Sequence, residues 1–217
     1  MGASVFQYIY NIIFYFALGC NRIPQKISLF FKKSHRTLFS NAIFFVIIEG
    51  VISFQRFYEM SIEIVKDYLA NFGLAERVRE LALSSATVEL AAAALGTDCA
   101  RIAKSITLYH RDGNCLMLIA AGDVKIDNAK FKQVFGFKAR MMSHEDALAA
   151  TGHAVGGICP FALPAGVTVF LDRSLERFAT VFPAAGTANS AVEMNCDELF
   201  RASNACEWVD VCKPREA

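Results

Sequence analysis

A run of seven apolar residues, Cys115 to Ala121, is the feature that most restricts how this chain folds. A strand that is apolar on both faces needs cover on each side, so we predict that this run is central in a sheet. Just before it, Arg111-Asp112-Gly113 has the composition of a hairpin turn, and Ile102 to Leu108 alternates as a partner strand does. The chain is therefore built around a hairpin whose second strand is fully buried.

Short helices and strands alternate around this hairpin, without long strand-helix-strand units. That pattern is typical of a single compact α+β domain with a mixed sheet, and not of a doubly wound one. Ser61, Thr87 and Ser143 have the residue types that cap helices. The predicted helices are 62–72, Val88–Leu95, Asn128–Phe135, 144–150 and Asp197–Ala202, and the further strands are Arg77–Leu83, Val167–Leu171, Phe178–Phe182, Ala191–Met194 and Glu207–Val211.

The first 59 residues differ in composition from the rest, so we divide the chain into residues 1–59 and 60–217. The first part holds ten of the 19 Phe but only three Ala. Its apolar run Val5–Gly19 is interrupted by Gln7 and is shorter than the roughly 20 apolar residues that span a bilayer. Three interpretations stay open: sequence translated from a start codon placed before the true start at Met60, a membrane anchor, or an ordered extension that binds a partner.

Charge and cysteine content restrict the partners of the second part. Residues 60–217 carry 16 basic against 19 acidic side chains, which argues against coating nucleic acid by charge alone. Positive charges gather in one stretch, which is either a solvated helix face or a local rim for phosphates and contains Lys125, Lys130, Lys132, Lys138 and Arg140. The seven cysteines form no CxxC pair, so we expect reduced thiols, a cytoplasmic protein, no zinc site and no cofactor.

Lys104 is the first candidate site residue, because it interrupts the apolar face that Ile102, Ile106 and Leu108 form. An ammonium group among such side chains is costly. The cost falls if the group is paired, extends to the surface, or opens into a pocket. The pattern alone leaves these three possibilities open.

The second candidate is the loop Gly156-Gly157-Ile158-Cys159-Pro160. Two glycines let a backbone turn and let a ligand approach its amides, although an ordinary tight turn has the same letters. Cys159 with His153 permits a cysteine hydrolase, but Cys159 equally fits a small buried residue, and no GxSxG, Walker or Rossmann pattern occurs. Together with Lys104, Asp172 and the turn Gly186–Ser190, the loop amides are suited to holding an acyl ester.

Several short motifs follow one another in order over about 90 residues. They are Ala100–Ser105, Ile126-Asp127, Thr151-Gly152-His153, Gly156–Phe161, Phe170–Asp172 and Gly186–Ser190. Together they resemble the YbaK/EbsC family, also called the prolyl-tRNA-synthetase-associated or aminoacyl-tRNA editing domain, and the resemblance covers nearly all of residues 60–213. It implies a single mixed domain that hydrolyses the ester of a mischarged aminoacyl-tRNA in trans.

The resemblance also implies roles for residues. Lys104 matches the lysine that engages the 3′-terminal adenosine and its phosphate, and Gly156–Pro160 matches the GxxxP loop that cradles the aminoacyl carbonyl. Water attacks with help from the substrate, so no protein nucleophile is expected. Cys159 stands where YbaK-type members commonly carry Ser, which leaves the amino acid open. Further expected substrate-binding residues are His153, Asp172, Asn189, Ser190, Lys125 and Lys130.

The expected partners are a tRNA acceptor end and, as a further candidate, prolyl-tRNA synthetase. A membrane is a partner only if residues 1–59 are translated and insert. The alternative is a noncatalytic module that binds tRNA ends or a synthetase.

Overall fold

The buried run forms strand β3 (Cys115–Ala121), the middle strand of a five-stranded sheet of order β6-β2-β3-β5-β8. The computed structural model describes residues 62–215, and in it no residue of β3 is more than 2% exposed. β2 (Ile102–Tyr109) pairs with β3 antiparallel, and β5 (Val167–Asp172) pairs with its other edge in parallel. The predicted hairpin and the mixed α+β fold are confirmed.

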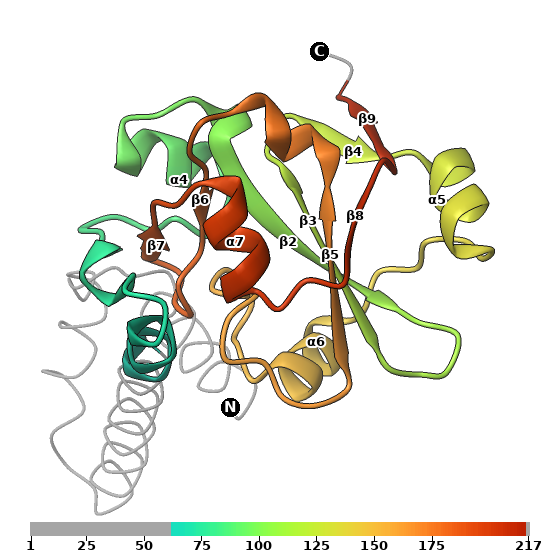
Figure 1. Cartoon of the computed structure of the whole chain (residues 1–217), viewed down its shortest axis with the longest axis horizontal. Helices are drawn as coiled ribbons and strands as arrows, with labels where there is room; N and C mark the ends of the chain where they lie inside the picture. The colour runs from blue at the N-terminus through green and yellow to red at the C-terminus, as the bar shows by residue number, and fades with distance from the viewer. Residues whose placement is uncertain (1–61, 216–217) are drawn as a thin grey trace, which may run out of the picture. The chain divides into compact units, whose positions relative to one another are not determined.

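Four labelled helices surround this sheet: in Figure 1, α7 lies in front of it, α6 below it, and α4 and α5 to its left and right. Their bounds are α4 Val88–Leu95, α5 Asn128–Phe135, α6 His144–Thr151 and α7 Cys196–Ala202, and residues 62–70 are also helical. The cap residues Thr87 and Ser143 accept backbone amides as predicted, at Leu90 and Asp146. The main core joins α5, α7 and the helix at residues 62–70 to β3, with Phe131, Phe161 and Leu199 fully buried, whereas Ala91 and Ala92 of α4 belong to a smaller cluster with Phe182.

Shorter strands complete the domain. β6 (Phe182–Pro183) and β8 (Glu207–Val209) form the edges of the main sheet. Two small two-stranded sheets pair β1 (Val78–Glu80) with β7 (Ser190–Val192), and β4 (Val124–Ile126) with β9 (Cys212–Pro214). Residues 75–77, 99–101 and 173–177 form 3-10 helices.

The edge elements differ from the prediction. The strand predicted at Phe178–Phe182 is found only at its end, where Val181 forms an isolated bridge with Met194 and β6 begins at Phe182. The strand predicted at Arg77–Leu83 shortens to β1, and the one predicted at Ala191–Met194 becomes β7, which begins one residue earlier and ends at Val192. β4 and β9 escaped prediction, because three residues are too few for an alternating pattern to be distinctive.

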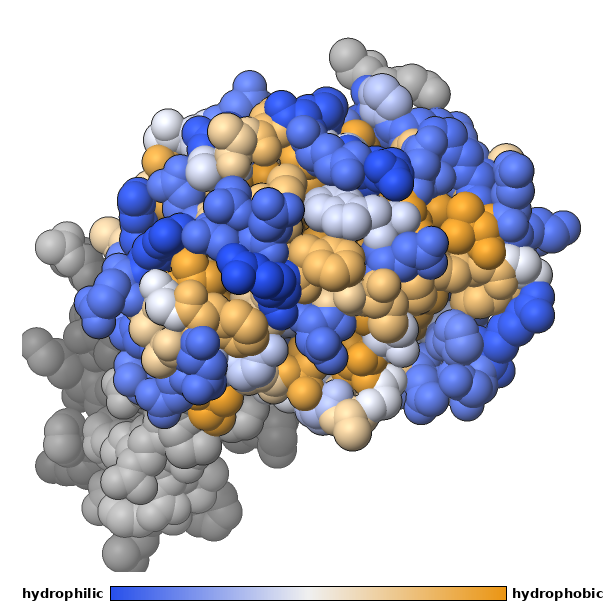
Figure 2. Space-filling model, viewed as in Figure 1, coloured by the Kyte–Doolittle hydropathy of each residue, from blue (hydrophilic) through white to orange (hydrophobic). Residues whose placement is uncertain are grey.

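The three interpretations of residues 1–59 and the predicted cap at Ser61 concern residues outside the described part of the chain, so they stay predictions. Within residues 62–215 no helix is both long and apolar enough to cross a membrane. Figure 2 shows a mostly hydrophilic face, with hydrophobic patches between charged side chains.

Candidate functional site

A cavity of about 290 Å³ opens beside strand β2, between α4, the start of α6 and the glycine loop. Lys104, Gly156 and Ile158 line it, so the structure brings together the lysine and part of the loop that the sequence singled out. Most of the other lining residues are apolar, among them Val88, Leu95, Ile102, Ile106, Met142 and Phe182. An apolar cavity with a few converging polar groups is the usual form of a small-ligand site.

Lys104 is half-buried on β2, and the partners of its ammonium group within residues 62–215 are two carbonyl oxygens. Its Nζ donates to Gly122 O, in the turn after β3, at 3.2 Å, and to Val124 O, at the start of β4. Burial, and then the nearby Arg215 guanidinium, lower the pKa of Lys104 to about 8. The lysine is therefore still mostly protonated at pH 7, and it combines two of the possibilities that the sequence left open: it is hydrogen-bonded and it faces a cavity.

The glycine loop packs tightly on the turn at residues 186–190. A Cβ on Gly157 would lie 2.6 Å from Thr187 Cα and 2.7 Å from Gly186 O, so only glycine fits. Gly156 has φ of +93°, a backbone conformation that favours glycine. Gly157 N donates to Ala154 O at 2.9 Å, but among the described residues the amides of Gly156 and Ile158 donate to no partner. These two amides therefore have no partner within residues 62–215, and their role in binding a ligand stays a prediction.

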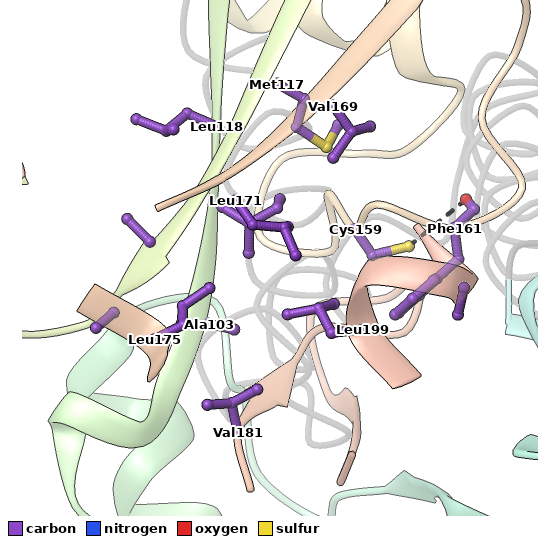
Figure 3. Packing of buried hydrophobic residues seen from close by; sticks show 14 of the residues in the cluster. Ala103, Met117, Leu118, Cys159, Phe161, Val169, Leu171, Leu175, Val181 and Leu199 are labelled. Carbon is purple, nitrogen blue, oxygen red and sulfur yellow. Dashed lines mark hydrogen bonds between the residues drawn. The ribbon is translucent and has the colours of Figure 1, made fainter. Parts of the chain in front are cut away.

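Cys159 and Pro160 support the loop from beneath, because both are buried and neither lines the cavity. The Cys159 thiol lies 3.5 Å from His153 Nε2 and 3.9 Å from Phe161 O. Figure 3 shows it inside the apolar core, near Leu171 and Leu199. Burial raises the pKa of Cys159 to about 12 and lowers that of His153. A buried, protonated thiol is a poor nucleophile, so the pair is structural.

Four predicted substrate-binding residues lie away from the cavity lining. His153 is buried, with its Nε2 3.0 Å from Phe161 O. Asp172 is 1% exposed and accepts the amides of Ser174 and Val211, each at 2.9 Å. Lys130 pairs with Asp210 at 2.7 Å, and Lys125 lies on β4 opposite Lys213. The structure therefore does not gather these four side chains at one site.

Asn189 and Ser190 belong to the turn that supports the glycine loop. Asn189 Nδ2 donates to Leu81 O at 3.1 Å, which ties the turn to the segment before α4. Ser190 lines the cavity, but its Oγ accepts Thr187 N and donates to Thr187 O. We infer that this turn holds the shape of the cavity wall.

Sequence reasoning missed Ser105, which also lines the cavity. Its Oγ is buried and has no hydrogen-bond partner in the described part of the chain. The available signal was that Ser105 directly follows Lys104, the one charged residue of the strand. The sequence does not show, however, which part of the strand edge stays unpaired.

Comparisons with known proteins identify the family to which this chain belongs. The model of the "Aminoacyl-tRNA editing domain" family matches residues 84–202. The uncharacterized protein YwhH of Bacillus subtilis is 46% identical over 157 residues, which cover 72% of this chain and all of YwhH. The proline--tRNA ligase of Solidesulfovibrio magneticus is 33% identical over 129 residues, 58% of this chain but only 21% of the ligase.

Two solved structures share the fold over most of the chain. One is a proposed trans-editing enzyme for prolyl tRNA synthetase, with a TM-score of 0.64 and 26% identity over 70% of this chain and 97% of that one. The other, a hypothetical protein, has a TM-score of 0.63 and 27% identity over 69% of this chain and 99% of its own. With more than half of its length matched by the family model, the chain belongs to the aminoacyl-tRNA editing domain family.

Proposed function

We propose that this protein is a trans-acting aminoacyl-tRNA deacylase, which removes a wrongly attached amino acid from the 3′ end of a tRNA. The observation that carries the proposal is the cavity itself, which Lys104, Gly156 and Ile158 line together, while the amides of Gly156 and Ile158 have no partner among the described residues. Membership of the editing family, and the similarity to a proposed trans-editing enzyme for prolyl tRNA synthetase, support it.

Each polar group has a place in the reaction. The Lys104 ammonium attracts the phosphate of the terminal nucleotide, as a cation in a partly desolvated site does. The Gly156 and Ile158 amides donate to the ester carbonyl oxygen while negative charge develops on it. Such donors are typically worth about 3 kcal/mol each in the transition state.

Water, and not a side chain, is the attacking group in this proposal. The water oxygen bonds to the ester carbonyl carbon, the bond from that carbon to the ribose oxygen breaks, and the ribose oxygen takes up a proton. The products are the free amino acid and a tRNA with its terminal hydroxyls restored. The neighbouring ribose hydroxyl of the substrate is placed to pass the proton, which agrees with a Cys159 thiol that lies outside the cavity.

The test is hydrolysis of a panel of tRNAs, each charged with a wrong amino acid, by the full chain. Because tRNA(Pro) carrying cysteine or alanine is the first substrate to expect from the prolyl-tRNA synthetase resemblance, it heads the panel, with correctly charged tRNA(Pro) as the control. Release of amino acid from at least one mischarged tRNA supports the proposal. Measurable binding of uncharged tRNA without turnover on any member overturns it in favour of a noncatalytic binding module.

A further inference from the structure

Strand β2 has an unpaired gap in the edge that faces the cavity. On the edge of β2 that faces away from β3, the strand pairs with β6 only at Ile102 and Ala103. Further along, the segment at residues 140–142 takes over, since Tyr109 N donates to Arg140 O and Met142 N donates to Thr107 O, at 2.9 and 3.0 Å. Between Ala103 and Thr107 no described strand continues the ladder.

Ser105 presents its main-chain groups in that gap. Backbone groups on a strand alternate between its two edges. Those of Tyr109 and Thr107 point away from β3, so those of Ser105, two residues further back, point the same way. The Ser105 N–H and C=O have no partner in the described part of the chain, and its buried Oγ has none either. One residue of the cavity wall thus offers a donor and an acceptor side by side, and a hydroxyl next to them.

The surroundings restrict what can bind there. Residues from three elements, Leu95, Ile102 and Phe182, give the cavity apolar walls. At the gap itself, Ser105 offers an uncharged main-chain donor and an uncharged acceptor, so a neutral group with the complementary pair suits it best. What fits is a neutral, flat ring that carries an acceptor and a donor on one edge. Adenine has this pattern, with a ring nitrogen that accepts beside an amino group that donates.

We propose that the Ser105 main chain, at the gap in β2, binds the edge of the terminal adenine of tRNA, with its N–H donating to a ring nitrogen and its C=O accepting from the amino group. This inference rests on the proposed function. It assigns the base of the terminal nucleotide to Ser105, whereas Lys104 binds the phosphate of that nucleotide. It also divides the site, because the glycine loop is left to the aminoacyl group.

Small nucleotides test the assignment on the unaltered full chain. Adenosine 5′-monophosphate, purine riboside 5′-monophosphate and ribose 5-phosphate share the phosphate, but only the first has the amino group and only the first two have the ring. We expect binding, measured by calorimetry, to weaken roughly tenfold on loss of the amino group and further on loss of the ring. Equal affinity for all three would overturn the assignment, even if deacylation is found.

A second measurement locates the contact. In amide NMR spectra, adenosine 5′-monophosphate should shift and protect the Ser105 N–H, while the Ile119 N–H on the neighbouring strand β3 serves as the control. Ser105→Pro removes this donor, together with the hydroxyl, at a strand edge, where proline is tolerated. If it folds, it should bind adenosine 5′-monophosphate and purine riboside 5′-monophosphate with more nearly equal affinity. Binding of the nucleotide that leaves the Ser105 amide unshifted would place the base elsewhere. Nucleotide binding without any deacylation would instead refute the proposed function alone.

Discussion

Lys104 and Asp172 are both charged residues of the central sheet, yet their surroundings differ. Asp172, at the end of β5, accepts two buried amides, from Ser174 and from Val211. Lys104, on β2, donates to the carbonyls of Gly122 and Val124, and it lines the cavity. The buried carboxylate is fully engaged in holding the chain together, whereas the lysine keeps a charge next to open space.

The difference separates a structural charge from a functional one. A buried charge that stabilises a fold needs its hydrogen bonds supplied by the protein. A charge that binds a ligand needs part of its shell left for that ligand. Substituting each residue should therefore damage different properties, activity for Lys104 and stability for Asp172.

The largest effect is expected for Lys104→Met, which removes the charge and keeps most of the apolar side chain. We predict a loss of deacylation of about 100-fold in kcat/KM, as for loss of a charged hydrogen bond to the phosphate of the substrate. The thermal midpoint should change little, because the cost of burying an ammonium disappears together with two hydrogen bonds to carbonyls. Rates on the mischarged substrate and a melting curve check both.

Lys130→Met is the matched control for that substitution. Lys130 is a lysine already paired with Asp210 at the surface, so its loss should change kcat/KM by less than about twofold. If the two variants lost activity equally, the role of Lys104 would be no more than its contribution to the general charge.

Asp172→Asn should have the opposite profile. The substituted amide group cannot accept both buried N–H groups as the carboxylate does, so one is left without a partner. We expect unfolding to require about 2 to 3 kcal/mol less free energy, measured by urea denaturation. The rate per folded molecule should stay the same, and a loss of activity without a loss of stability would show that Asp172 acts in the reaction.

The pH profile follows the charge of Lys104. Because its pKa is lowered to about 8, it loses its proton as the pH rises through that value. We predict that kcat/KM, which reports on the free enzyme, is level below pH 7 and falls about tenfold per pH unit well above 8. Hydrolysis without enzyme rises over the same range and must be subtracted. A profile that stays level to pH 10 would contradict a requirement for the charged lysine.

Signals confined to short stretches made much of the fold predictable. The apolar run of β3, the turn before it and the caps at Thr87 and Ser143 each act within a few residues, and all are found in the structure. Lys104 was detectable in the same way, because one charge interrupts an alternating face. The sequence therefore located the hairpin and Lys104, the charged residue of the hairpin that lines the cavity.

Contacts between distant segments could not be predicted from the sequence. The Val211 amide, which donates to the Asp172 carboxylate, is 39 residues away from it in the sequence. Thr187, which fills the space beside Gly157, comes 30 residues after that glycine. Without these contacts, Asp172 looked available for a ligand. The gap at Ser105 is of the same kind, since it depends on where β6 stops and where residues 140–142 begin.

Cys159→Ser tests the smallest difference, which is between two neighbours in the glycine loop: Ile158 lines the cavity, whereas Cys159 is buried behind it. The Cys159 thiol is fully buried, 3.5 Å from His153 Nε2, with a pKa raised to about 12. A serine hydroxyl is smaller and more polar, so we expect a stability loss of about 1 kcal/mol. The rate should remain within about twofold, because the amides of Gly156 and Ile158 keep their positions. Iodoacetamide should likewise leave the folded enzyme active, since it reacts with exposed thiolates. A 100-fold loss in the serine variant with unchanged stability would identify the thiol as a nucleophile, and the water mechanism would then be wrong.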